Sequence, residues 1–162
     1  MIRKARIKDA KTIQRLINMF AKQDLMMPRS LNEIFENIRD FWVALDKKNN
    51  VIGCAALHIV GWDNLAEIKS LAVHKKFQKR GFGALLVQSL MEEAAELEVE
   101  KVFALSYQPK FFKRFGFKII AKSRLPHKVW AECCNCPKFP NCGEIALIKD
   151  MEPHRKKHTA SF

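Results

Sequence analysis

Apolar residues at the start of the chain follow first the period of a strand and then that of a helix. Residues 2–7 alternate weakly and predict a strand. Helical spacing then recurs in a set of four apolar residues: Ile13, Leu16, Ile17 and Phe20. We expect Asp9 to cap the helix that contains them. Ser30 and Glu33 form a capping-box signature, which predicts a second helix that ends near Ile38.

Three β-rich runs in the middle of the chain predict a meander of antiparallel strands. The runs 40–46 and 51–60 are separated by a short polar turn, in which Asn49 and Asn50 would tolerate a positive φ. A third run of the same character covers 65–73. We therefore expect two hairpin-connected strands and a third strand beside them.

Helical and extended patterns alternate over the rest of the chain. The segment 81–97 predicts a long helix. Its expected apolar stripe consists of Phe82, Leu85, Leu86, Leu90, Ala94 and Leu97. A short helix should begin at Pro109 and end at Gly116, and further strands are expected over 101–107, 117–120 and 144–150. The pattern predicts an α+β fold, with a mixed, mostly antiparallel sheet of about six to seven strands flanked by about four helices.

Length and composition favour one globular domain. The chain has 162 residues, of which 48% are hydrophobic, enough for one core. We assign residues 1–150 to this domain and residues 151–162 to a basic polar tail. Apolar runs fall short of the about 18 residues that a membrane span requires, and the first residues lack a signal-peptide pattern. We therefore expect a soluble cytosolic protein that does not bind membranes.

The charge of the chain predicts an affinity for anions. The formal net charge is +12, which would attract phosphorylated cofactors, acidic metabolites or nucleic acid. The 29 Lys and Arg residues are spread along the whole chain rather than gathered in one block. We therefore do not favour nucleic acid as a partner.

One short loop has the composition of a phosphate-binding site. "QKRGFG", residues 78–83, stands between a predicted strand and a predicted helix. Gly81 and Gly83 would let a diphosphate approach the backbone, and the amides of a helix N-terminus would bind it. The basic residues of the loop are Lys75, Lys76, Lys79 and Arg80. Leu86 occupies the place of the third glycine of a dinucleotide motif, and the alternative interpretation is a glycine-rich turn without a ligand.

The loop and its surroundings resemble a known superfamily. "LAEIKSLAVHKKFQKRGFGALL" is similar to the acyl-CoA binding motif of the GNAT N-acyltransferases, and "FFKRFGF", residues 111–117, is similar to their second landmark. The resemblance implies a GNAT fold and acetyl-CoA as co-substrate. The implied cofactor-binding residues are Leu71, Ala72, Val73, Gln78, Lys79, Arg80, Gly81, Phe82 and Gly83. Backbone groups of Leu71 and Val73 would pair with the pantetheine arm.

Four segments show a closer resemblance to the short, single-domain N-acetylglutamate synthases of bacterial arginine biosynthesis. They cover 26–44, 61–74, 105–117 and 125–142. This resemblance implies an amino-acid acceptor, L-glutamate first. Homodimers are common among such proteins, and the sequence itself leaves the oligomeric state open. Arg29 is our first candidate for the acceptor carboxylates, with His127 and Lys128 as second candidates. For each of these three residues, a solvated surface position is the alternative.

The resemblance also suggests which residues act in acetyl transfer. Glu67 stands where related enzymes carry a carboxylate general base, although it could equally be a cross-strand partner of Lys69. Phe112 occupies the position at which many relatives have a tyrosine that protonates the leaving thiolate. Tyr107 could replace that tyrosine, or serve only in packing or capping. The thiolate could also leave without an acid, because thiols have a pKa of about 8.5.

Four of the five cysteines are close together near the end of the chain, at Cys133, Cys134, Cys136 and Cys142. Cys133, Cys136 and Cys142 could bind zinc with His127 as a fourth ligand, but the spacing lacks paired Cys-x2-Cys repeats and Cys134 interrupts the pattern. We predict reduced thiols and no metal.

The alternatives to amino-acid acetylation are transfer to another amine, such as a protein N-terminus or a polyamine, and a non-catalytic acetyl-CoA sensor.

Overall fold

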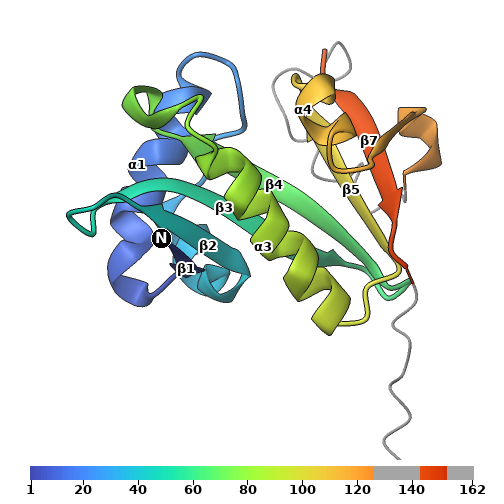
Figure 1. Cartoon of the computed structure of the whole chain (residues 1–162), viewed down its shortest axis with the longest axis horizontal. Coiled ribbons are helices and arrows are strands. Elements are labelled where there is room, and N and C mark those ends of the chain that lie inside the picture. Colours follow the sequence, from blue (N-terminus) through green and yellow to red (C-terminus); the bar gives the residue numbers. More distant parts are fainter. Residues whose placement is uncertain (126–142, 153–162) are drawn as a thin grey trace, which may run out of the picture.

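The chain forms one sheet with the strand order β1-β2-β3-β4-β5-β7-β6 (Figure 1). The computed structural model describes residues 1–125 and 143–152. The strands within them are β1 (Ile2–Lys4), β2 (Phe41–Leu45), β3 (Val51–Val60), β4 (Leu65–Val73), β5 (Lys101–Ser106), β6 (Lys118–Ile120) and β7 (Ile145–Asp150). Neighbouring strands run antiparallel except β4 and β5, which are parallel. The predicted fold class is confirmed.

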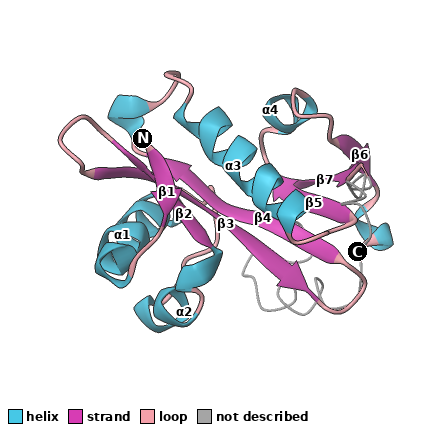
Figure 2. Cartoon of the chain, turned by 60° about the horizontal axis from the view of Figure 1, so that its bottom comes forward, coloured by secondary structure: helices cyan, strands magenta, loops and turns pink. Residues whose placement is uncertain are grey.

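Helices cover both faces of this sheet (Figure 2). The α-helices of the described residues are α1 (Ala10–Ala21), α2 (Leu31–Glu36), α3 (Phe82–Glu96) and α4 (Pro109–Lys113). Cys54 and Ala56 of β3 pack with α1 and α2, whereas Ala55 and Leu57 pack with α3. Because successive side chains of a strand point to opposite faces, α3 lies on one face and α1 with α2 on the other.

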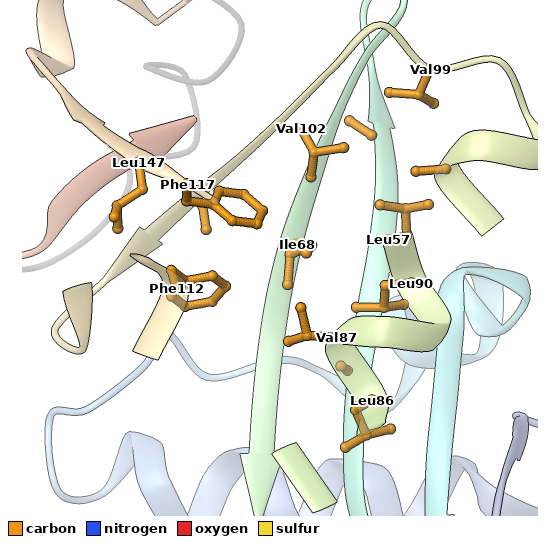
Figure 3. Close-up of a cluster of buried hydrophobic side chains, with 14 of the residues drawn as sticks. Leu57, Ile68, Leu86, Val87, Leu90, Val99, Val102, Phe112, Phe117 and Leu147 are labelled. Atoms are coloured by element: carbon orange, nitrogen blue, oxygen red, sulfur yellow. The ribbon is translucent and has the colours of Figure 1, made fainter. Parts of the chain in front are cut away.

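The cluster on the α3 side forms the largest part of the core. Leu86, Val87 and Leu90 of α3 are fully buried against the sheet. Phe112 and Phe117, from α4 and the turn after it, belong to the same cluster and are directed toward Ile68 and Val87 in Figure 3. The short α4 is therefore anchored to the sheet and to α3 by aromatic packing.

The start of the chain differs from its predicted form. The strand ends at Lys4 rather than residue 7, and a 3-10 turn, Ile7–Asp9, precedes α1. Asp9 gives α1 no side-chain cap. Its carboxylate instead accepts hydrogen bonds from the Arg3 guanidinium, at 2.7 and 3.1 Å, and from the Arg6 amide, at 2.8 Å. The carboxylate binds Arg3 and the Arg6 amide, which both precede it in the chain, and does not cap α1. The cap prediction was therefore wrong.

Turn and cap predictions succeeded where local backbone chemistry is decisive. The Ser30 hydroxyl accepts a hydrogen bond from the Glu33 amide at 3.1 Å, which confirms the predicted cap of α2. Gly116 ends the α4 region with a φ of +87°. Asn49 takes a φ of +63°, but Asn50 is not among the residues with positive φ; its side chain donates a hydrogen bond to Asp46.

The apolar stripe of α3 is narrower than predicted. Leu85 is 47% exposed and Leu97 is 56% exposed, while Val87, which the predicted stripe omitted, is buried. The sheet contacts the helix along a line centred on Leu86 and Leu90, and Leu85 lies outside that line.

Among the described residues, no helix has the length and hydropathy needed to cross a bilayer.

Candidate functional site

Two neighbouring strands separate at the middle of the sheet. The parallel ladder of β4 and β5 joins Leu65 to Lys101, Ala66 to Val102 and Glu67 to Phe103. Beyond this last pair the two strands diverge toward α4 and the start of α3 (Figure 1). The second half of β4 therefore has an edge that does not pair with β5, and we use the word opening for the place where the backbones of these two strands diverge.

An extra residue in β4 distorts the strand beside this opening. Lys69 pairs with Ala56 and Ala72 pairs with Cys54, so three steps along β4 match two steps along β3. Ser70 within the bulge has a φ of +55°. A β-bulge turns backbone groups out of the regular ladder and re-aims the side chains that follow. Backbone groups of Leu71 and Val73 therefore lie on the strand segment that borders the opening.

The loop after β4 leads directly into the N-terminus of α3. The His74 amide donates to the Ile52 carbonyl at 2.8 Å, and the Gln78 side-chain amide donates to the Val73 carbonyl at 3.0 Å. Lys79 has a φ of +62°, and Gly81 is the N-cap of α3 with a φ of +87°. These two left-handed residues form the turn into α3, whose first amides have no hydrogen-bond partner within the helix.

Positive charge surrounds this helix N-terminus. Lys75, Lys76, Lys79 and Arg80 are all exposed. The Arg80 guanidinium lies 5.4 Å from the centre of the Phe77 ring, and this ring contacts Phe82 edge to face. The partial positive charge of the helix N-terminus and four nearby cations create a favourable position for a diphosphate. The loop thus has the local geometry that its sequence predicted.

The start of α3 also faces α4 across the opening. A Cβ on Gly83 would stand 3.6 Å from the Phe111 ring and 4.0 Å from Cγ2 of Val73. The Phe111 ring in turn lies under the Arg114 guanidinium at 5.4 Å. Side chains from β4, α3 and α4 therefore meet where the ends of the two strands are furthest apart.

Glu67 is buried at the point where the strands separate. Its exposed fraction is 7%, and it belongs to the last pair of the parallel ladder. Its neighbours Ala66 and Ile68 pack toward α3, so its side chain projects to the opposite face. Asp9 and Glu67 are the buried charged residues of the described part of the chain, and the bonds of Asp9 to Arg3 and Arg6 account for the first.

The usual tyrosine position, Phe112, and the candidate acid, Tyr107, differ in environment. Phe112 is 4% exposed and packs edge to face on Phe117, so this position belongs to the core rather than to the opening. Tyr107 follows β5 and is half-buried, with its ring 3.4 Å from a Cβ built on Gly143. A hydroxyl is available at Tyr107 and absent at Phe112.

Arg29 lies on the face of the sheet that α1 and α2 cover. Its amide donates to Oδ1 of Asn18 at 3.4 Å, and its carbonyl accepts from Gln14 at 3.4 Å, so α1 holds its backbone. Its side chain is 17% exposed, and the guanidinium lies 3.8 Å from the Glu33 carboxylate. This is not the solvated position that the alternative interpretation expected.

Several predicted residues cannot be placed. His127, Lys128 and the four clustered cysteines lie outside the described residues. Within residues 1–125 and 143–152, no group of three or more His, Cys, Asp or Glu side chains is arranged to hold a metal ion. The remaining cysteine, Cys54, is buried, and burial raises the pKa of its thiol to about 12 despite a hydrogen bond from the Ala72 backbone. It is a protonated packing group beneath the bulge.

One polar pair beside Glu67 was absent from the predicted site. His58 of β3 pairs with Glu67 in the antiparallel register, and its Nδ1 lies 2.8 Å from Oδ2 of Asp40. The sequence contained a signal for it, because His58 is a histidine within the otherwise apolar run of β3. Only the register of the sheet shows that this histidine stands opposite the buried carboxylate.

Comparison with known proteins assigns the class. Residues 7–117 match the acetyltransferase (GNAT) family, and the chain belongs to this family. It is 44% identical over 150 residues to an uncharacterized N-acetyltransferase of Chlorobaculum tepidum, covering 93% of this chain and 96% of that one. It is also 32% identical over 136 residues to the amino-acid acetyltransferase of Mycobacterium tuberculosis, covering 83% and 77%.

Solved structures agree with this assignment. Rv2747 from Mycobacterium tuberculosis, solved in complex with CoA, superposes with a TM-score of 0.81 at 28% identity over 94% of this chain and 99% of that chain. N-acetylglutamate synthase from Neisseria gonorrhoeae, complexed with CoA and N-acetylglutamate, gives a TM-score of 0.82 at 24% identity, and 35% of that chain is covered. The second comparison shows a shared fold, and the predicted resemblance to the GNAT acetyltransferases is confirmed.

Proposed function

We propose that this acetyltransferase moves the acetyl group of acetyl-CoA to the α-amine of a small amino acid, with L-glutamate as the preferred acceptor. The observation that carries the proposal is the position of Glu67, a buried carboxylate at the separation of β4 and β5 and three residues before the Ser70 bulge. The family supplies the reaction class, and a relative named amino-acid acetyltransferase supports the acceptor class.

Acetyl-CoA would bind along the opening. Its pyrophosphate would accept hydrogen bonds from the backbone between Gln78 and Gly83, within the positive potential of the loop. Its pantetheine arm would run along the exposed edge of β4 at Leu71, Ala72 and Val73, as an added strand does. The complex of CoA with the neighbouring Mycobacterium tuberculosis protein supports this placement.

The transfer would proceed by direct attack. Glu67 takes one proton from the acceptor ammonium, and the free amine attacks the thioester carbonyl to form a tetrahedral intermediate. Backbone amides at the bulge would stabilise its oxyanion. Collapse forms the amide C–N bond, breaks the C–S bond and releases CoA. The nitrogen loses its second proton as the intermediate collapses, and this proton ends on the departing sulfur, so that the products are the amide, CoA thiol and protonated Glu67.

Tyr107 is our candidate to protonate the departing sulfur, because the usual position is a buried phenylalanine, Phe112. Departure as a thiolate is the alternative, since a thiol pKa of about 8.5 makes this anion a stable leaving group. Substitution of Tyr107 by Phe separates the two: an unchanged turnover number means that the thiolate leaves without this acid.

A glutamate acceptor presents two carboxylates. Arg29 is proposed to bind one of them, because a shielded guanidinium offers paired donors at the geometry of a carboxylate. His127 and Lys128 remain predictions for the other carboxylate. Four further points are likewise predictions: a role in arginine biosynthesis, a cytosolic location, a homodimer, and the division into a domain of residues 1–150 and a tail.

Product analysis tests the proposal. The protein would be incubated with acetyl-CoA and each of the twenty amino acids, several polyamines and N-terminal peptides, and the products identified by mass spectrometry. A dominant N-acetylglutamate product is the expected result. A dominant product from a polyamine or a peptide would show that this amine, and not L-glutamate, is the acceptor. Thermal stabilisation by acetyl-CoA without any product would indicate a non-catalytic sensor.

A further inference from the structure

A histidine and an aspartate lie beside Glu67 on the same face of the sheet. His58 and Glu67 are directly opposite each other in the β3–β4 register. Leu57, which precedes His58, packs toward α3, so His58 projects to the other face, as Glu67 does. Opposite residues of an antiparallel pair have Cβ atoms about 4.5–5.5 Å apart, so the two side chains start as close neighbours.

Asp40 fixes the orientation of the imidazole. It ends the 3-10 turn Ile38–Asp40, and its Oδ2 lies 2.8 Å from Nδ1 of His58. An ionised carboxylate can only accept a hydrogen bond, so Nδ1 carries the proton in this contact. The neutral ring is thereby held as the tautomer whose Nε2 is free to accept a proton.

Solvent exposure increases from the carboxylate to this pair. Glu67 is 7% exposed, whereas the side chains of His58 and Asp40 are 38% and 27% exposed. His58 is therefore opposite the buried acid in the strand register and is itself accessible to water. The charged residues of the elements that flank His58 are Arg39 and Asp40 in the 3-10 turn and Glu67 and Lys69 in β4.

The reaction creates a proton that must leave Glu67. An ammonium acceptor and acetyl-CoA yield an amide, CoA thiol and one proton. One nitrogen proton ends on the sulfur, and the other, taken by Glu67 before the attack, must reach solvent before the next turnover. A carboxyl group with 7% exposure has little direct contact with water, so a second titrating group would speed its deprotonation.

We propose that His58, oriented by Asp40, is a positioning residue that relays this proton from Glu67 to solvent. Protonated Glu67 gives its proton to Nε2 of His58, directly or through one water molecule. The imidazolium is stabilised by Asp40 and then releases the Nε2 proton to bulk solvent. With an ordinary pKa of about 6.5, a histidine can both accept and release a proton near neutral pH. This inference rests on the proposed function, because it assigns Glu67 as the base.

The test is chemical rescue of His58→Gln in the full-length protein. The turnover number would be measured at low buffer concentration from about pH 6 to 9, and then with increasing imidazole. We expect a loss of at least about tenfold at neutral pH, with little change in KM for either substrate. Imidazole should restore activity in proportion to its concentration. Glu92→Gln on α3, on the opposite face of the sheet, is the matched control and should behave as wild type.

Asp40→Asn provides a second, independent measurement if His58→Gln does not fold. This substitution keeps the imidazole but removes the charge that stabilises the imidazolium. In a plot of turnover number against pH, the acidic limb should therefore move to lower pH. A wild-type turnover in His58→Gln, a loss that imidazole does not restore, or an unchanged profile in Asp40→Asn would overturn the relay. A wild-type protein without any acetylated product would instead refute the proposed function itself.

Discussion

The ring of Phe111 lies 3.6 Å from the position that a Cβ on Gly83 would occupy, so α4 packs against the first turn of α3. Gly81, two residues earlier, has no atom within 4 Å of such a Cβ, but its φ is +87°. The two glycines of the loop are therefore constrained differently. Gly81 is constrained by its backbone conformation, whereas a Cβ on Gly83 would make only ordinary contacts with Phe111 and Val73.

Alanine substitutions at the two positions should differ in their effect on the free energy of unfolding. Gly81→Ala should lower the free energy of unfolding by about 1–2 kcal/mol, because the left-handed conformation is unfavourable for a residue with a Cβ. Gly83→Ala should leave it unchanged or raise it by up to about 1 kcal/mol, because alanine favours the helix and the contact with Phe111 is ordinary. Urea unfolding measures both. Equal destabilisation by the two substitutions would contradict this distinction.

Tyrosine at position 112 should not restore a general acid. Phe112 is 4% exposed and its ring packs on Phe117, so Phe112→Tyr places a hydroxyl against apolar side chains. We expect a loss of stability of about 1–3 kcal/mol and no gain in turnover number. Thermal unfolding and steady-state kinetics test this together. An increased turnover number would show that the side chain reaches the reacting sulfur.

Arginine at position 29 should be required for its shape as well as its charge. A lysine keeps the charge but loses the paired donors that match a carboxylate. We expect Arg29→Lys to raise KM for glutamate by about tenfold or more, with KM for acetyl-CoA unchanged. Lysine keeps the positive charge beside the Glu33 carboxylate, so stability should change little. Unchanged kinetics for glutamate would remove Arg29 from the acceptor site.

Acid should weaken the fold partly through Asp9. Burial alone would raise the pKa of its carboxyl, but the hydrogen bonds from Arg3 and the Arg6 amide outweigh burial and hold this pKa below its ordinary value of 3.8. The ionised carboxylate therefore stabilises the fold above that pH, and this contribution is lost as the pH falls through the folded-state pKa.

Asp9→Asn gives the corresponding measurement. Near neutral pH the variant should be less stable by about 1–3 kcal/mol, because an amide cannot replace the charged hydrogen bonds to Arg3. The difference from wild type should shrink as the pH falls below about 4, since protonation removes the same charge from the native protein. A difference that stays constant with pH would show that the carboxylate is not ionised through this contact.

Sequence patterns predicted the fold well because local chemistry and periodicity agree along most of the chain. The third strand of the meander was predicted over 65–73 and matches β4. The left-handed Gly116 lies in the turn after α4, which itself ends at Lys113. Asp9 was misassigned because its partner Arg3 lies in the preceding strand, where a local cap signature has no information. Leu85 was misassigned because a helical wheel does not show how far the sheet extends under α3.

The candidate site was less accessible to sequence reasoning. The loop at Gly81 could be proposed from sequence because a strand, a basic glycine-rich segment and a helix N-terminus follow one another along the chain. The pairing of His58 with Glu67 depends on the register of two strands, and the contact with Asp40 on the position of a short 3-10 turn. Such tertiary relationships have no fixed spacing along the chain.

The most direct test of the account is the turnover number of Glu67→Gln compared with its affinity for acetyl-CoA. The substitution preserves the size of the side chain and removes its ability to accept the ammonium proton. We predict that the turnover number, measured by N-acetylglutamate formation, falls by at least about 100-fold. The Kd for acetyl-CoA, measured by calorimetry, should stay close to that of wild type. A folded Glu67→Gln protein with wild-type turnover would contradict the account, because acetyl transfer would then proceed without its proposed base.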